Sequence, residues 1–363
     1  MLAEKLSSIL DTFKTKYPSL IGVDISSTAI KLVELAEAGK GAYRLERYAI
    51  EPLVRDVVTD GNIANLDLVS DALKRAHKRL GSRNRNIALA LPAAMVITKK
   101  IVVPSGQREE DLELQVEAEA NQYIPFALDE VNLDFQIIGP APNNPDESEV
   151  LIAASRKEKV EDRVAVAEAA GLKPRVMDIE SYAMQQAFEL IAPTLPASGR
   201  DQNIALIDIG AHVTHFYVLR NGQFLFSRDQ AFGGNQLTHD IQRAFNLAPD
   251  EAESAKKSQG LPDNYDADVL QPFMETLALE VTRALQFFFT STSYSQIDQI
   301  VLAGGCALLP GIDDLVAKRA GVPAIVANPF ANMATSDRVR PRQLAQEAPL
   351  LMIACGLALR SFE

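Results

Sequence analysis

One sequence pattern occurs twice in this chain, and the repeat constrains the fold more than any other feature. The stretch Ile204 to Leu219, IALIDIGAHVTHFYVL, has an apolar run that ends at an aspartate, a turn of small and hydroxyl residues, and a second apolar run. Ile21 to Leu35, IGVDISSTAIKLVEL, has the same layout. Each copy predicts a strand, a tight turn and a strand. We therefore expect two related halves, with these residues equivalent: Asp24 and Asp208, Ser26 and Gly210, Thr28 and His212, Leu35 and Leu219.

The two turns carry the residue types of a phosphate site. A glycine such as Gly210 lets the backbone approach a ligand closely, and successive turn amides that point one way bind anions. Asp24 and Asp208 each stand where a strand ends, placed to hold magnesium, usually through water. One such turn alone is more often structural than functional. Two turns that face each other across a cleft can hold one phosphate chain from both sides.

Composition places the chain among soluble globular proteins. It has 363 residues, 47% hydrophobic and 23% charged, which is long enough for two domains with full cores. The net charge of −12 argues against a nucleic-acid-binding surface. Cys306 and Cys355 are expected as buried free thiols rather than as a disulfide or metal ligands. No apolar run reaches the ~20 residues that span a bilayer, so we expect a cytoplasmic protein that does not insert into the membrane.

One helix is expected before the first hairpin and one after it. Residues 2–17 carry an apolar stripe, which either packs on the protein's own surface or docks on a membrane or partner. The stretch from Asp67 to Leu80 is expected as a helix that Gly81 ends. His77 stands among its basic residues, and we interpret this side of the helix as a solvated face.

From residue 86 to residue 176 the pattern changes and predicts an inserted module. The expected order is β-β-α-β-β-α-β, with helices from Glu109 to Tyr123 and from Lys157 to Ala170, typical of a small α+β unit. The acids in the first turns of the first helix suit the helix dipole, and a solvated face explains them better than a metal site. The polar, Pro-rich stretch from Pro140 to Glu149 is expected as an exposed, mobile loop.

The remaining candidate positions lie at glycine pairs and at helix starts. Glu180 stands at a strand-to-helix junction, where it either serves the helix start or faces a cleft and orients water or metal. Gly233 and Gly234 precede a helix whose positive end suits a phosphate. Gly304 and Gly305 follow an apolar strand, where bare backbone lets a flat ring such as adenine lie close. Neither a Walker loop nor G-x-G-x-x-G occurs.

Five segments of the chain resemble the five nucleotide-site motifs of the actin, Hsp70 and sugar-kinase superfamily. They are the turns VDISS and IDIGAHVT, the VLAGG strand end, the DIESYA junction and the small-residue C-terminal helix. The module at 86–176 resembles subdomain 1C of the FtsA branch. Within that branch, nearly the whole chain resembles the PilM family of actin-like type IV pilus assembly proteins.

The resemblance implies an α/β fold with two duplicated actin-like (RNase H-like) domains around a nucleotide cleft. It also implies an inserted FtsA-type 1C subdomain of the SHS2-like α+β kind. On this basis the first domain takes residues 1–85, 177–199 and 343–363, the inserted subdomain residues 86–176, and the second domain residues 200–342.

The resemblance further implies that ATP and Mg²⁺ bind in the cleft. Asp24 and Asp208 would hold the metal, usually through water, and Asp208 with Glu180 would act in catalysis, Glu180 by positioning water. Ribose and base would be contacted by Glu253 and by Lys256 or Lys257, although surface ion pairing explains that spacing equally well. The other implied ATP-binding residues are Ser26, Ser27, Thr28, Lys31, Gly210, Ala211, His212, Thr214, Gly233, Gly234, Gly304, Gly305 and Ala307.

Two departures from the superfamily pattern lower the expected turnover. Ser26 replaces the usual glycine of the first turn, and His212 is larger than the residues usual in the second, so we expect ATP binding with weak or no hydrolysis. As partners the resemblance implies the cytoplasmic N-terminus of the membrane protein PilN and the pilus motor ATPases, which would recruit the protein to the inner face of the inner membrane. Self-association stays open, as do an FtsA-like filament-forming ATPase of cell division and a sugar-kinase-like phosphotransferase.

Overall fold

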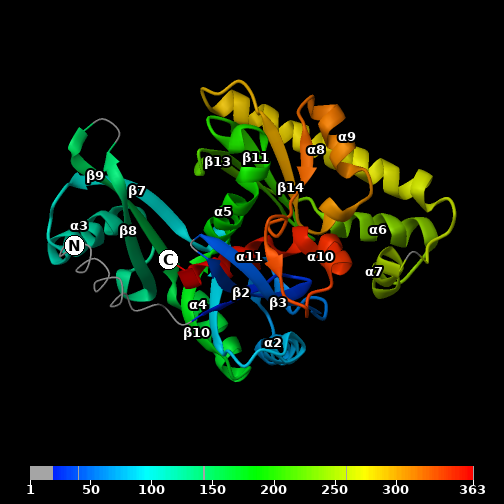
Figure 1. Cartoon of the computed structure of the whole chain (residues 1–363), viewed down its shortest axis with the longest axis horizontal. Coiled ribbons are helices and arrows are strands. Elements are labelled where there is room, and N and C mark those ends of the chain that lie inside the picture. The colour runs from blue at the N-terminus through cyan, green and yellow to red at the C-terminus, as the bar shows by residue number, and fades with distance from the viewer. Residues whose placement is uncertain (1–18, 40, 142–143, 259, 363) are drawn as a thin grey trace.

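The computed structural model describes residues 19–362 except 40, 142–143 and 259. Figure 1 shows two lobes, one above the other, and a smaller module at the side of the lower lobe. Each lobe is built on one sheet with helices on its outer face, and two helices, α5 (Glu180–Ile191) and α11 (Met352–Leu359), lie between the lobes. The helix expected at residues 2–17 lies outside the described residues.

The two lobes repeat the same strand order, which confirms the duplication. The lower sheet runs β10-β6-β1-β2-β3, with the short strand β16 added beyond β3, and the upper sheet, read from the equivalent edge, runs β15-β14-β11-β12-β13. In each sheet, the aspartate-bearing strand, β1 or β11, begins an antiparallel three-stranded unit. On its other side the same strand pairs in parallel with β6 or β14. The lower strands are β1 Ile21–Ile25, β2 Ala29–Gly39, β3 Ala42–Pro52, β6 Asn86–Leu91, β10 Lys173–Ile179 and β16 Ala334–Thr335; the upper strands are β11 Asn203–Ile209, β12 Thr214–Arg220, β13 Gln223–Gln230, β14 Gln299–Ala303 and β15 Ala324–Val326.

Helices cover the outer faces of both sheets. The lower sheet packs against α2 (Leu66–Leu80) and α4 (Lys157–Ala169), and the upper sheet packs against α6 (Gly234–Phe245) and α8 (Gln271–Ser291). Asn65 caps α2 by accepting from the amide of Leu68, and Gly81 ends it in the left-handed conformation, as the sequence predicts. Three further helices complete the upper lobe and the return to the lower one: α7 Pro249–Ser258, α9 Ile312–Ala320 and α10 Pro341–Glu347.

The module at the side is smaller than expected. Its three-stranded sheet consists of β7 (Ile97–Pro104), β9 (Asn144–Arg156) and β8 (Val131–Ala141), covered by α3 (Glu109–Tyr123). The strands expected at both edges of the 86–176 module, β6 and β10, pair instead with each other in the lower sheet. The element order was predicted correctly, but a strand's partner cannot be read from its own sequence.

Two other expectations differ from the structure. Most of the stretch from Pro140 to Glu149, expected as a mobile loop, belongs to the β8–β9 hairpin, because cross-strand pairing continues to Ala141 and Asn144. The short strand β16 pairs with β3 in the lower sheet, although residues 200–342 were assigned to the second domain. Cys306 and Cys355 are buried and free, as expected. None of the helices described is long and apolar enough to cross a membrane.

Two glycines, Gly22 and Gly356, allow α11 to pack closely against β1 and α5. A Cβ at Gly356 would lie 1.8 Å from the carbonyl oxygen of Ala183 in α5, and a Cβ at Gly22 would lie 1.9 Å from the carbonyl oxygen of Ala354. These contacts confirm that the small residues of the last helix serve close packing. They hold β1 and α5 against the same helix, and the first aspartate turn and Glu180 project from these two elements.

We expect Gly356→Ala to destabilise the protein by about 1–3 kcal/mol or more, because the added methyl group overlaps backbone that cannot move without shifting α5. Gly305→Ala is the matched control, since a Cβ there meets only the Cδ2 of Leu350, at 3.8 Å. Chemical denaturation measures both variants. Equal stability of the two would contradict this account of the α11 packing.

Candidate functional site

The first aspartate turn is held by a lysine on the opposite strand. Asp24 is 3% exposed, and its Oδ2 lies 2.8 Å from Nζ of Lys31, the residue directly across the β1–β2 pair. Nζ also donates to Oγ of Ser26 at 3.3 Å, and that hydroxyl donates to the carbonyl of Ala29. Burial alone would lower the pKa of Lys31, but the charge and hydrogen bond of Asp24 raise it. Lys31 therefore stays positive.

The second turn is built entirely from backbone contacts. The amide of Gly210 donates to the carbonyl of Val213 at 3.0 Å, which closes the turn. The amides of Gly234 and Asn235, at the start of α6, donate to the carbonyls of Gly210 and Ala211 at 2.9 and 2.8 Å. A Cβ at Gly233 would lie 2.5 Å from the Gly210 oxygen. The structure therefore joins the expected Gly210 turn and the Gly233–Gly234 pair into one surface.

The VLAGG strand end meets the second aspartate. Gly304 has φ +82°, and a Cβ there would lie 2.4 Å from Oδ1 of Asp208. Only glycine suits this position, both for its left-handed backbone and for its closeness to the carboxylate. Cys306 lies two residues further on, with its Sγ against Gly234. Three separate sequence motifs thus converge on Asp208.

Three carboxylates form one electrostatic cluster between the lobes. Burial and the negative charges of Asp24 and Asp208 together raise the pKa of Glu180 to about 7, although the positive charges of His215 and Arg163 oppose the shift. Burial also raises the pKa of Asp208, with Asp24 adding to the effect and His215 and Lys31 opposing it. Asp24 and Asp208, which come from different lobes, therefore lie close enough to influence each other, as the duplicated turns require.

A histidine supplies positive charge from the second lobe. His215 stands across from Asp208 in the β11–β12 pair, as Lys31 stands across from Asp24. Its Nδ1 lies 2.7 Å from Oδ1 of Asp229. Burial alone would lower the pKa of His215, but the hydrogen bond to Asp229 and the charges of Asp208, Asp229 and Glu180 raise it to about 9.

A buried arginine of the lower lobe adds positive charge near the three carboxylates. Arg163 in α4 is 1% exposed, and its guanidinium donates to the carbonyls of Ala90 and Gly61 at 3.0 and 2.9 Å. Burial lowers its pKa, whereas the negative charges of Glu180 and Asp24 favour its charged form. These two bonds join α4 to the end of β6 and to the hairpin of β4 (Val58–Thr59) and β5 (Asn62–Ile63).

The Glu253 group lies beside the second turn. Glu253 accepts from Lys256 at 2.6 Å, from Lys257 at 3.0 Å and from the hydroxyl of Thr238 at 2.7 Å. Burial would raise the pKa of Glu253, but these bonds lower it to about 2. Lys256 also donates to Thr238, in the helix that begins at Gly234. The sequence was equally consistent with simple ion pairs on the helix surface. Lys257 forms such a pair with Glu253, whereas Lys256 also reaches the carbonyl of Gly234 at the start of α6.

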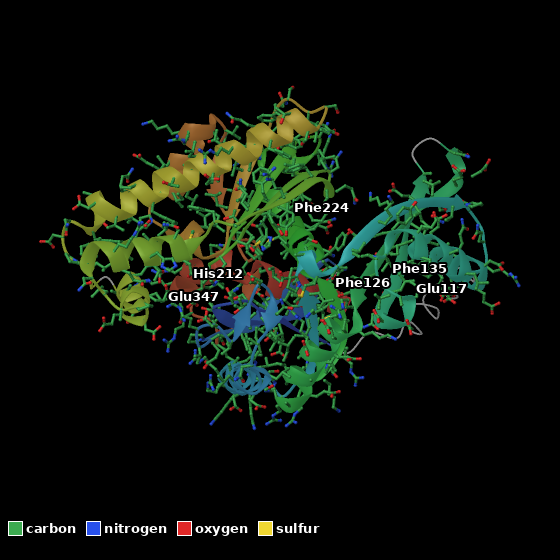
Figure 2. The ribbon with its side chains drawn as sticks, turned by 180° about the vertical axis from the view of Figure 1, so that it is seen from behind. Glu117, Phe126, Phe135, His212, Phe224 and Glu347 are labelled. Atoms are coloured by element: carbon green, nitrogen blue, oxygen red, sulfur yellow. The ribbon has the colours of Figure 1, made fainter. Side chains whose placement is uncertain are left out.

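Not every candidate faces the cluster in the same way. His212 is exposed next to the Asn235 side chain, and Figure 2 shows it where the two lobes meet. Thr214 is buried and donates to the carbonyl of Phe232, so its hydroxyl serves the fold. Ala307 is also buried, behind Gly304. Thr28 is exposed, and its carbonyl accepts from the amide of Leu53, while Ser27 is half-buried.

Magnesium fits this donor set only as an indirectly held ion. Among residues 19–362 as described, no three His, Cys, Asp or Glu side chains gather as a direct metal site. Among the described residues, the partly buried carboxyl groups of Asp208 and Glu180 have no hydrogen-bond partner, and Gly304 has no Cβ that would press on Asp208. Carboxylates that face one space without touching can hold a hydrated Mg²⁺, which keeps several waters.

Sequence reasoning missed three polar residues of this region. His215 could have been found, because it follows Asp208 by the same interval as Lys31 follows Asp24. Arg163 could not, because it comes from the helix assigned to the inserted module. Thr238 looked like an ordinary helix residue, and only the packing of α6 on α7 brings it to Glu253.

We expect Asp229→Asn to lower the pKa of His215 from about 9 toward its ordinary value near 6.5, because the variant removes a charge and a charge-assisted hydrogen bond. A raised histidine pKa stabilises the fold below pH ~6.5, and this contribution disappears as the pH rises through about 9. NMR titration of the imidazole measures the shift. Asp201→Asn, at an exposed position, is the control, and an unchanged His215 titration in Asp229→Asn would contradict the assignment.

A family model described as type IV pilus assembly protein PilM matches residues 22–362. A chain of a PilM–PilN type IV pilus biogenesis complex has a TM-score of 0.79 and 29% identity, over 96% of this chain and 99% of that one. The ethanolamine utilization protein EutJ of Carboxydothermus hydrogenoformans has a TM-score of 0.57 and 18% identity, over 99% of both chains.

A more distant sequence relative is the cell division protein FtsA of Neisseria meningitidis, 23% identical over an alignment 397 residues long that covers 98% of this chain and 91% of FtsA. These likenesses confirm the actin-like fold that the repeated aspartate turns and the ordered motifs predicted. The family match extends over both lobes and the side module. The chain belongs to the family of the type IV pilus assembly protein PilM.

Proposed function

We propose that this protein is a cytoplasmic, ATP-binding scaffold of type IV pilus assembly whose cleft takes ATP with Mg²⁺. The observation that carries the nucleotide part is the convergence of Asp24, Asp208 and Glu180, from three separate segments, beside the glycine surface at Gly233 and Gly304. A purely structural role would not require three carboxylates to be brought together at a cost in free energy.

The residues around the cluster suit the parts of a bound nucleotide. Asp24 and Asp208 would hold the metal's water shell, and the start of α6 would receive phosphate oxygens at its positive end. Lys31 would bind phosphate as a point charge once the metal shares Asp24. The group of Glu253 and Lys256 would bind ribose and base. Bound Mg²⁺ would supply charge neutralisation for the polyphosphate.

The partner proposal comes from the related complex. The chain of the PilM–PilN complex is 29% identical to this one over nearly its full length. We propose that this protein likewise binds the cytoplasmic N-terminus of a PilN-like membrane protein. That contact would recruit it to the inner face of the inner membrane and link the membrane platform to the pilus motor ATPases.

We propose weak turnover, because the side chains of Ser26 and His212 occupy the two aspartate turns. The hydroxyl of Ser26 is already committed to Ala29 and Lys31, and the His212 ring lies beside Asn235 at the start of α6. Ser26 and His212 therefore restrict the space for a water that would attack the terminal phosphate. Glu180, whose pKa of about 7 suits a general base at neutral pH, would position such a water, so the proposed slowness depends on Ser26 and His212 alone.

We expect Asp208→Ala to abolish magnesium-dependent ATP binding while leaving the protein folded, because it removes half of the metal's carboxylate pair. Calorimetric titration with ATP, with and without Mg²⁺, measures the effect. Asp263→Ala, at an exposed position of the upper lobe, is the control. Unchanged affinity in Asp208→Ala would show that nucleotide does not bind at this cluster.

We expect the wild-type protein to hydrolyse ATP more slowly than the ordinary enzyme range of ~1–10³ per second. The double variant Ser26→Gly/His212→Ala should turn over faster with little change in affinity, because it opens both turns. Phosphate release under saturating Mg²⁺-ATP measures the rates. A wild-type rate in the ordinary range would contradict the proposed scaffold role, whereas loss of PilN-peptide binding alone would leave the nucleotide proposal untouched.

A further inference from the structure

The lower lobe carries a basic surface at the end of α2 that the nucleotide site does not use. No acidic residue occurs in the sequence between Asp71 and Glu109, although the whole chain has a net charge of −12. A hollow of about 460 Å³ lies there, between the ends of α2 and α4. Its lining is Lys74, His77, Lys78, Arg85, Ala169, Ala170 and Gly171. We call this the basic hollow.

Most cations of this surface lack a partner of opposite charge. Arg75 and Arg79 are paired with Glu51. In the part of the chain that the structure describes, Lys74, Lys78 and Arg85 form no ion pair. The dipole of α2 favours cations in its last turn, which accounts for Lys78 but not for Lys74 in the middle of the helix or Arg85 beyond it.

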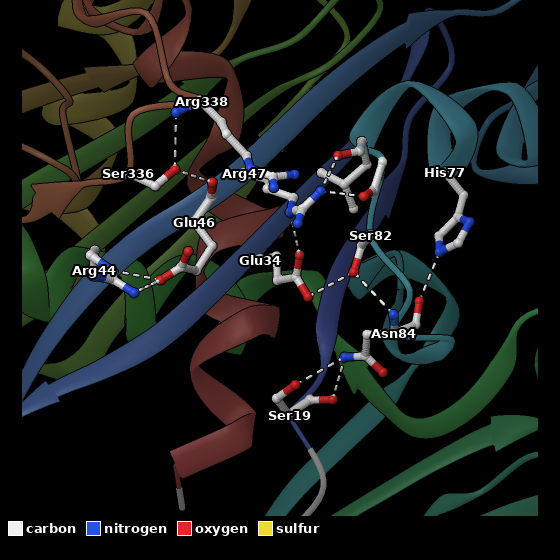
Figure 3. Close-up of polar contacts among 12 residues, drawn as sticks. Ser19, Glu34, Arg44, Glu46, Arg47, His77, Ser82, Asn84, Ser336 and Arg338 are labelled. Atoms are coloured by element: carbon white, nitrogen blue, oxygen red, sulfur yellow. Dashed lines mark hydrogen bonds and ion pairs between the residues drawn. The ribbon is translucent and has the colours of Figure 1, made fainter.

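The basic hollow is rigid because the chain after α2 is fixed by polar contacts (Figure 3). His77 donates through Nε2 to the carbonyl of Asn84 at 2.8 Å, and the Asn84 side chain donates to the carbonyl and hydroxyl of Ser19. The hydroxyl of Ser82 donates to Glu34 in β2 at 2.8 Å. A preformed surface loses little entropy when a partner binds.

A complementary surface lies on α3 of the side module. Its buried face is Leu112, Val116 and Ala120, so the outer face is Glu110, Leu114 and Glu117, at helical spacings of four and three. Leu114 is 67% exposed. Glu110 and Glu117 flank it and form no ion pair with any described residue. A single exposed leucine needs no explanation, but an apolar centre with a charged rim is typical of a contact surface.

These two surfaces cannot meet within one molecule. Figure 1 shows α3 on the side module and α2 at the bottom of the lower lobe, and Figure 2 shows Glu117 on the outer part of the module in the opposite view. The opposite charges of the two surfaces therefore point to another copy of the chain. An anionic membrane is a poorer occupant, because it is flat and would repel a protein of net charge −12.

We propose that the α3 face of one copy docks in the basic hollow of the next, with Leu114 against Ala169 and Ala170. Glu110 and Glu117 then face Lys74, Lys78 and Arg85. Such a contact uses two different patches, so it is heterologous and propagates from copy to copy unless the rotation closes a ring. It leaves the cleft between the lobes free.

Salt dependence is the first test. Sedimentation velocity of the full chain should show assemblies at ~0.01 M ionic strength that dissociate to monomers at ~1 M, since the Debye length falls from about 30 Å to about 3 Å. A monomer at both ionic strengths would overturn the proposal. So would binding to phosphatidylglycerol vesicles without self-association.

Charge reversal separates this contact from general electrostatics. Lys74→Glu/Lys78→Glu and Glu110→Lys/Glu117→Lys should each abolish self-association, because each places like charges in contact. An equimolar mixture of the two variants should associate again, since every docking then joins opposite charges. Failure of the mixture to associate would overturn the proposed pairing even if both variants are folded and monomeric.

Matched controls carry the same charge changes elsewhere. Lys318→Glu/Arg319→Glu on α9 controls for the first variant, and Asp263→Lys/Glu275→Lys controls for the second; both should associate like the wild type. Their failure to associate would indicate a net-charge effect and overturn the site assignment.

The apolar centre is tested without any charge change. Leu114→Ser should weaken association by about tenfold or more, because a leucine loses its buried surface. Val102→Ser is its control, because Val102 is 52% exposed on β7, on the face of the side-module sheet that α3 does not cover. Equal association of Leu114→Ser and the wild type would remove Leu114 from the contact.

Discussion

Bringing three carboxylates together in a space largely removed from water is the constraint on which the centre of this protein depends. Like charges at short range repel strongly where the dielectric constant is low, and burial alone already opposes ionisation. The raised pKa of Glu180, about 7, records this cost. The surrounding fold supplies one cation from each direction: Lys31 from the lower hairpin, His215 from the upper hairpin, and Arg163 from α4.

The two halves share a strand order but not their chemistry. Lys31 contacts Asp24 directly, whereas His215 occupies the equivalent place and turns to Asp229 instead. Asp24 therefore has an ion-pair partner, whereas Asp208, which the Gly304 backbone approaches closely, forms no ion pair with any described residue. A cation that enters the cleft therefore meets Asp24, which is already paired with Lys31, and Asp208, which is paired with no described residue. The duplicated fold thus gives an asymmetric site, which suits a ligand whose two ends differ.

Local pattern predicted the elements well, because turn chemistry and hydrophobic period act over short distances. The α3 helix and the ends of α2 follow from such signals, and the two aspartate turns were found from the repeat. What the sequence could not give was partnership between distant segments. The placement of β6 and β10 in the lower sheet depends on strand pairing, and so does the continuation of the hairpin through Pro140. Arg163 belongs to the same class, since its two hydrogen-bond partners lie 73 and 102 residues away in the sequence.

The family's fold was recognisable because its motifs are local, whereas the finer chemistry arises where those motifs meet. Gly304 was expected in sequence only as bare backbone beside a flat ring, whereas the structure explains it by its left-handed conformation and by Asp208, which lies 2.4 Å from where a Cβ would be. In the same way, Thr238 gains its role from the packing of one helix on another.

The lower lobe is assembled from segments separated by most of the chain. The amide of Leu20 donates to the hydroxyl of Ser361 at 2.7 Å, and α11 packs against both β1 and α5. The upper sheet is made from residues 203–326 alone. During synthesis on the ribosome, the upper lobe can therefore fold while the lower one waits. The face of the lower sheet that carries Val33, Leu35 and Leu45 packs on α11, so this apolar face stays only partly covered until residues beyond 350 have emerged, and it is open to wrong contacts during most of translation.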